Sequence, residues 1–110
     1  MEIRQLSEQY YVSGQLAPGD LAALAEHGFR TIVNNRPDDE SPGQPASKEL
    51  AAEAARLGIR YLYLPVVSGG ITDENVADFA RASRDLEGPV LLFCRSGARS
   101  TALWRLGQSP

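Results

Sequence analysis

One eight-residue segment near the end of the chain brings together a cysteine, two arginines and two serines. It reads Phe93-Cys94-Arg95-Ser96-Gly97-Ala98-Arg99-Ser100 and follows an apolar run at residues 90–93. The backbone N–H groups of a small glycine-containing loop, with the positive end of a following helix, can surround an anion. The arginines add forked donors suited to phosphate- or sulfate-like oxygens. The same field favours the Cys94 thiolate by lowering its pKa from about 8.5, which predicts nucleophilic catalysis at neutral pH.

The alternative for this segment is a buried structural thiol flanked by solvated arginines, which is the common situation for an isolated cysteine. Its position argues for a site, because it lies where a buried strand turns into a helix. In open α/β sheets, ligands bind beyond the carboxyl ends of the strands. We therefore expect the loop residues Arg95, Ser96, Gly97 and Ala98 to bind substrate around Cys94.

The elements that must position this loop alternate along the chain. We expect strands at residues 10–12, 29–33, 59–64 and 90–93. Helices are expected near Pro18 (ending before Gly28), from a cap at Ser47, from a cap at Thr72, and from Ser100 to Leu106. This alternation predicts an α/β fold with a mostly parallel central sheet and helices on both faces. Strand 59–64 has apolar residues on both faces, so Tyr61 and Tyr63 are predicted to be core residues.

Length and composition argue against several classes of function and of site. The chain has 110 residues, which predicts a single domain, and a net charge of −3. This charge argues against a general nucleic-acid or membrane-surface binder. The single cysteine excludes an internal disulfide and the single histidine excludes a two-histidine zinc site. No metal or organic cofactor is implied. The chain has no signal-peptide pattern and no apolar run of about 20 residues, so a cytoplasmic location is expected.

Several stretches of the chain resemble the phosphatase-like domain of the beta-lactamase hydrolase-like family. They are Ala17-Pro18, residues 28–38, residues 61–66, Ile71-Thr72, residues 88–91, residues 94–100 and Leu103-Trp104. The resemblance covers residues 1 to about 106 and implies a fold similar to the protein-tyrosine and dual-specificity phosphatases. It implies that Cys94 is the nucleophile, that Arg99 binds the anion and that the Ser100 hydroxyl steadies the thiolate. The family's last helix usually continues past the point where Gly107 ends it here.

The resemblance also implies partners. Many family members are assigned as sulfur transferases, alone or fused to a persulfide dioxygenase or a flavin disulfide oxidoreductase. An oxidoreductase or dioxygenase of sulfur metabolism is therefore an expected partner, and the expected substrate is a small anion. No nucleic acid or membrane partner is expected.

Loop length and the proton donor separate two reactions. Four residues lie between Cys94 and Arg99, as in rhodanese sulfurtransferases, whereas the phosphatases have five and usually a histidine where Phe93 stands. A phosphatase also needs an acid, and Asp73 is the first carboxylate after strand 59–64; it is either that acid or a helix N-terminal charge. These features favour a thiosulfate or persulfide sulfurtransferase with a Cys94 persulfide. The alternatives are a phosphatase-like hydrolase with a phosphocysteine, and a non-catalytic anion-binding or docking module.

Two further arginines have two interpretations each. Arg36 follows a predicted strand end, so it either reaches the same pocket and binds substrate or pairs with the acidic residues 38–40. That acidic segment itself is typical of a solvated turn. Arg95 either lies on the rim of the loop, where it attracts anions, or is an ordinary surface charge.

Overall fold

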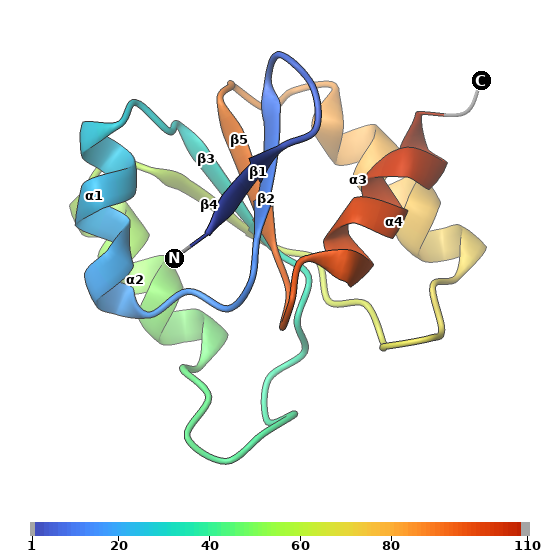
Figure 1. Ribbon diagram of the computed structural model, residues 1–110, viewed down its shortest axis with the longest axis horizontal. Helices are drawn as coiled ribbons and strands as arrows, with labels where there is room; N and C mark the ends of the chain where they lie inside the picture. The colour runs from blue at the N-terminus through green and yellow to red at the C-terminus, as the bar shows by residue number, and fades with distance from the viewer. Residues whose placement is uncertain (1, 109–110) are drawn as a thin grey trace.

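The computed structural model describes residues 2–108 and contains one five-stranded sheet in the order β1-β2-β5-β3-β4 (Figure 1). The strands are β1 (Ile3–Gln5), β2 (Tyr10–Ser13), β3 (Thr31–Asn34), β4 (Arg60–Tyr63) and β5 (Val90–Phe93). β1 pairs with β2 in an antiparallel manner, and the other three pairings are parallel. The predicted mostly parallel sheet is thus confirmed.

Helices cover both faces of this sheet, as predicted. The 3₁₀ helix η1 (Pro18–Asp20), α1 (Leu21–Glu26) and α2 (Ser47–Arg56) lie on one side, and α3 (Asp73–Ser83) and α4 (Ala98–Gly107) on the other (Figure 1). Each side has its own apolar cluster, built around Leu24 and Leu50 on one face and around Phe79 and Leu103 on the other. No helix of the described residues is long and apolar enough to cross a membrane.

The central strand β5 holds the predicted functional segment in place. All four of its residues are buried, and they alternate between the faces: Leu91 and Phe93 pack on the α1–α2 side, Val90 and Leu92 on the α3–α4 side. Alternation of this kind is what a strand covered on both faces requires. The loop that begins at Cys94 therefore starts from the buried central strand of the sheet.

The structure corrects the prediction for the strand after α2. β4 lies at the edge of the sheet, where only one neighbour can cover it, and Arg60 and Tyr63 are exposed. Tyr63 is 39% exposed and accepts a hydrogen bond from Asp38 N, so it is not a core residue. Tyr61 is half-buried and packs against the α1–α2 cluster.

Element ends also differ from the sequence predictions. β1 was not expected, and β3 begins at Thr31 rather than at residue 29. Ala46, not Ser47, is the N-cap of α2, and the Ser47 backbone N–H donates to the Asp38 carboxylate at 2.8 Å. Thr72 caps α3 as predicted, its hydroxyl accepting from Asn75 N at 3.0 Å.

The last helix begins at Ala98, two residues before the predicted Ser100, and continues to Gly107. Trp104 is half-buried on this helix and packs against Tyr10. The sequence analysis also predicted that this last helix is shorter than in related chains. Residues 109–110, which that prediction includes, lie outside the described residues.

Candidate active site

Three loops meet where β5, β3 and β4 end. Backbone hydrogen bonds continue past the strand ends: Asn35 N donates to Phe93 O at 2.8 Å, and Val66 N donates to Asn35 O at 2.9 Å. The segments after the three strands are therefore held side by side by the same kind of ladder that forms the sheet. This is the edge at which ligands bind in open α/β sheets.

The Cys94 loop folds back over its own sulfur. Cys94 is 1% exposed, and the Gly97 N–H donates to Cys94 Sγ at 3.1 Å. Gly97 adopts φ = +95° as the N-cap of α4, a conformation that residues with a Cβ rarely adopt. This turn directs loop N–H groups inward, while Arg95 and Ser96 remain exposed outside.

The environment of the sulfur favours the thiolate. Burial by itself raises the pKa of Cys94, but the backbone N–H groups of Ser100, Gly97 and Ser96 and the nearby Ser100 side chain, which all lower it, together outweigh burial. The net result is a pKa below the ordinary value for a thiol. A lowered pKa is what a nucleophilic cysteine needs at neutral pH.

Ser100 is fixed by a residue that the sequence analysis did not single out. Its hydroxyl donates to Asn35 Oδ1 at 2.8 Å, while Asn35 Nδ2 donates to Leu64 O at 2.9 Å. Because the Asn35 amide is held at both ends, the fully buried Ser100 Oγ stays beside the sulfur. Asn35 thus links the three loops to the nucleophile.

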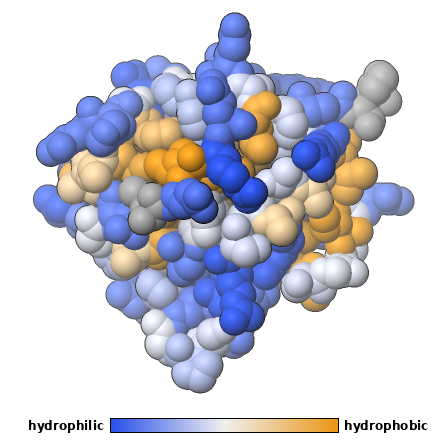
Figure 2. Space-filling view, in the orientation of Figure 1, coloured by the Kyte–Doolittle hydropathy of each residue, from blue (hydrophilic) through white to orange (hydrophobic). Residues whose placement is uncertain are grey.

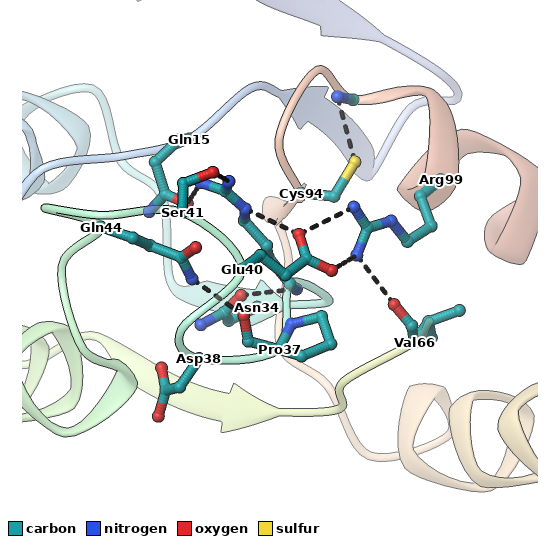
Figure 3. Close-up of polar contacts among 12 residues, drawn as sticks. Gln15, Asn34, Pro37, Asp38, Glu40, Ser41, Gln44, Val66, Cys94 and Arg99 are labelled. Atoms are coloured by element: carbon teal, nitrogen blue, oxygen red, sulfur yellow. Dashed lines mark hydrogen bonds and ion pairs between the residues drawn. The ribbon is translucent and has the colours of Figure 1, made fainter. Parts of the chain in front are cut away.

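Arg99 is held at one end of its guanidinium, as Figure 3 shows. Nη1 donates to Glu40 Oε2 and to Val66 O, both at 2.8 Å, and Nη2 donates to Glu40 Oε1 at 3.1 Å. A guanidinium has five N–H donors. The two that no residue among 2–108 accepts are Nε–H and the second Nη2–H, which lie along one edge in the parallel arrangement that binds two oxygens of a phosphate.

The contact of Glu40 with Arg99 is the main feature that the sequence analysis missed, because the acidic segment was expected either to pair with Arg36 or to be a solvated turn. Its side chain is only 24% exposed, and it pairs with Arg36 Nε at 2.9 Å as well as with Arg99. The hydrogen bond from Arg99 is the main cause that lowers the pKa of Glu40; burial opposes it and Arg36 adds to it. Glu40 is therefore a carboxylate over the neutral range.

Arg36 lies in the same cluster but takes the second of its two predicted roles. Its side chain is 6% exposed and donates to Glu40, to Gln15 Oε1 and to Ser41 Oγ, each at 2.9 Å. The structure thus pairs it with the acidic segment and connects it to Arg99 only through Glu40.

The remaining predicted residues lie at the margin of the site. Arg95 and Ala98 are exposed, and Ser96 Oγ accepts from Ala98 N at 3.3 Å. Asp73 is exposed in the first turn of α3, and within residues 2–108 no hydrogen bond or ion pair joins it to Cys94 or Arg99. Its position is that of a helix N-terminal charge.

This chain is similar in sequence and fold to known proteins. The model of the beta-lactamase hydrolase-like protein family, phosphatase-like domain, matches residues 2–110. This chain belongs to that family. A beta-lactamase hydrolase-like protein from Xylella fastidiosa strain Temecula1 is 37% identical over 108 residues, which are 98% of this chain. The chain spans only 25% of that relative's length.

Solved structures agree with the family assignment. A proposed phosphatase from Neisseria meningitidis Z2491 superposes with a TM-score of 0.84 at 34% identity, over 91% of this chain and 71% of the other. TpbA from P. aeruginosa, in complex with phosphotyrosine, superposes with a TM-score of 0.61 at 24% identity, over 86% and 54% of the two chains. The protein is thus a phosphatase-like domain with the fold of the protein-tyrosine phosphatases. These similarities favour the phosphatase-like alternative, and none of them supports the expected sulfurtransferase.

Proposed function

We propose that this protein is a cysteine-dependent, phosphatase-like hydrolase of a small phosphoester, with Cys94 as nucleophile. The observation that carries the proposal is the pairing of a thiol of lowered pKa with an arginine whose two free donors form a fork. The family assignment and the phosphotyrosine complex of TpbA support the choice of phosphate.

The reaction follows from these groups in two steps. The Cys94 thiolate attacks phosphorus, an S–P bond forms, and the ester P–O bond breaks with its electron pair on the leaving oxygen. Water then attacks the phosphocysteine, the S–P bond breaks, and inorganic phosphate leaves while the thiolate is restored and a proton goes to solvent. Loop N–H groups and the Arg99 fork bind the non-bridging oxygens, whose charge they stabilise in both transition states.

The test is rapid quenching of the protein with p-nitrophenyl phosphate, followed by intact mass. We expect a gain of one phosphoryl group on the wild type, and turnover that falls about 10³-fold or more in Cys94→Ser. A parallel incubation of reduced protein with thiosulfate measures the competing reaction. A gain of one sulfur atom on Cys94, with no hydrolysis of any phosphoester, would overturn the proposal in favour of sulfur transfer.

A further inference from the structure

The loop that carries Glu40 has no regular secondary structure. It runs from residue 35 to residue 46, between β3 and α2, and contains no Val, Leu, Ile, Met or aromatic residue. It forms the lower tip of the molecule in Figure 2, where the surface is hydrophilic. Because the loop has no apolar core of its own, its shape depends on backbone conformation and on polar contacts with the sheet.

The edge strand β4 anchors this loop through two tyrosine hydroxyls. Tyr61 OH accepts from Asn34 Nδ2 and contacts Ser47 Oγ, each at 2.9 Å, so it holds the residues that flank the loop on both sides. Tyr63 OH accepts from Asp38 N at 2.9 Å. Tyr63 therefore fixes the loop backbone two residues before the carboxylate that binds Arg99.

The backbone then turns sharply at Asp39. This residue has φ = +65°, and among residues 2–108 it is the one residue other than glycine with a positive φ. Asp is one of the few residue types that adopt this left-handed conformation without a large cost. In Figure 3 the Asp38 carboxylate points away from the pair formed by Glu40 and Arg99. The turn thus separates two acids that are close in the chain, and it directs only Glu40 to the site.

We propose that Tyr63 and the left-handed turn at Asp39 position Glu40 on Arg99. The inference rests on the proposed function, in which Arg99 binds the phosphoryl oxygens. Tyr63 fixes the backbone before the turn, and the turn brings the Glu40 carboxylate to Arg99 Nη1 and Nη2 at 2.8 and 3.1 Å. When either support is weakened, Glu40 leaves Arg99 more often, and the guanidinium loses the orientation with which it binds an oxyanion. Both are positioning residues, because they act on substrate through Glu40 and Arg99.

The first test removes the Tyr63 hydroxyl. In Tyr63→Phe we expect kcat/KM for p-nitrophenyl phosphate to fall about 3- to 10-fold, mostly through KM, which is the size of effect that one neutral hydrogen bond provides. Tyr11→Phe is the matched control. It removes a hydroxyl on β2 that accepts from Gln5 Nε2 at 3.2 Å, and it should leave the kinetics unchanged. Wild-type kinetics in Tyr63→Phe would overturn the role of Tyr63.

The second test separates the backbone of Asp39 from its side chain. A β-branched residue is strongly disfavoured at φ = +65°, so kcat/KM is expected to fall about 10-fold or more in Asp39→Val. Glycine adopts this conformation freely, so Asp39→Gly should keep wild-type activity although it lacks the carboxylate. Wild-type activity in Asp39→Val, or equal losses in both variants, would overturn the role of the turn.

A double-mutant cycle shows whether these residues act through Glu40. In the Glu40→Gln background, Tyr63→Phe and Asp39→Val should lower kcat/KM no further, because the contact that they support is already weakened. Losses that add in full to the loss of Glu40→Gln would show that they act elsewhere, and the inference would be overturned.

The same cycle in urea unfolding needs no activity. The unfolding midpoint is expected to fall in Tyr63→Phe and to fall less when Glu40→Gln is already present. If wild type hydrolyses no phosphoester, the proposed function fails. In that case coupled midpoints still support the positioning of Glu40 by Tyr63, and additive midpoints overturn it.

Discussion

Arg36 and Arg99 donate to the same carboxylate oxygen, Oε1 of Glu40, at 2.9 and 3.1 Å. Glu40, an acid from an irregular loop, therefore binds Arg36 of the loop after β3 and Arg99 of α4 in a single cluster, and Figure 3 shows its contact with Arg99. Glu40 accepts from Nη1 and Nη2 of Arg99. The Nε–H and the second Nη2–H, which lie along the other edge of the guanidinium, are therefore available for an oxyanion. We regard Glu40 as a positioning residue, since it acts on substrate through Arg99.

The first prediction concerns Glu40→Gln. The amide keeps the shape but loses the charge, and one of its two ends becomes a donor that faces a guanidinium. We expect kcat/KM for p-nitrophenyl phosphate to fall about 10- to 100-fold, mostly through KM, because a misplaced anion-binding group loses about 1.4–2.7 kcal/mol of oxyanion interaction. Steady-state kinetics measures this split.

Asp39→Asn is the matched control for Glu40→Gln. Asp39 is the exposed neighbour in the same loop, and the substitution removes the same charge. Its kinetics should equal those of wild type. If Asp39→Asn loses as much activity as Glu40→Gln, the effect comes from loop charge in general and Glu40 does not position Arg99.

The second prediction is a loss of stability in Arg36→Met. This substitution removes three hydrogen bonds from a nearly buried guanidinium and leaves Gln15 and Ser41 without their partner. Hydrogen bonds to charged groups contribute about 1.5–3 kcal/mol each, so the free energy of unfolding should fall by about 3 kcal/mol or more. Urea unfolding measures it. Arg56→Met, which breaks the exposed pair with Glu53, is the control and should unfold like wild type.

Most of the fold could be predicted from the sequence because it depends on local patterns. The apolar run at residues 90–93 identified the central strand, and Thr72 identified the start of α3. The wrong predictions concern residues whose burial depends on where their strand lies in the sheet. Strand 59–64 has apolar residues on both faces, like a buried strand, yet the order of the sheet places β4 at an edge, and that order depends on contacts between distant segments.

The site could be predicted only in part, for the same reason. Cys94 and Ser100 belong to one short segment of the chain. Their spacing in the sequence is therefore enough to predict that they lie together in the site. Glu40 and Asn35 are 59 and 65 residues away from their partners Arg99 and Ser100. No local pattern distinguishes Glu40 from its exposed neighbour Asp39. Only the contact with Arg99, which the fold creates, identifies Glu40 among the acidic residues of the loop after β3.

The third prediction follows from the lowered pKa of Cys94. The chain has one cysteine, so the ultraviolet thiolate absorbance of wild type minus Cys94→Ser reports this group alone. We expect its midpoint below the ordinary pKa of about 8.5. A midpoint at or above the ordinary value would contradict the thiolate assignment.

The same shift predicts how stability depends on pH. A thiol whose pKa is lower in the folded state binds fewer protons there than in the unfolded chain. The resulting stabilisation is fully present above the unfolded pKa of about 8.5 and is lost as pH falls through the folded pKa. The unfolding free energy of wild type minus that of Cys94→Ser should therefore increase with pH across this window, as urea unfolding at a series of pH values can show.

The last prediction concerns Gly97→Ala. At φ = +95° a Cβ strains the backbone, and it would lie 2.9 Å from Arg4 Nη2 and 3.3 Å from the Ser13 carbonyl oxygen. The Arg4 side chain can move away, but the strand that carries Ser13 cannot, so the loop itself must shift. We expect a loss of more than about 1 kcal/mol in unfolding free energy.

Activity should fall as well, because the shifted residue carries the N–H that binds Cys94 Sγ at 3.1 Å. The thiolate midpoint is then expected to rise in Gly97→Ala, which links the loss of activity to the loop rather than to unfolding. Gly19→Ala is the control: its added Cβ meets nothing within 4 Å, and its φ is not in the left-handed region. A Gly97→Ala protein with wild-type stability and an unchanged thiolate midpoint would show that the turn at Gly97 does not hold the nucleophile.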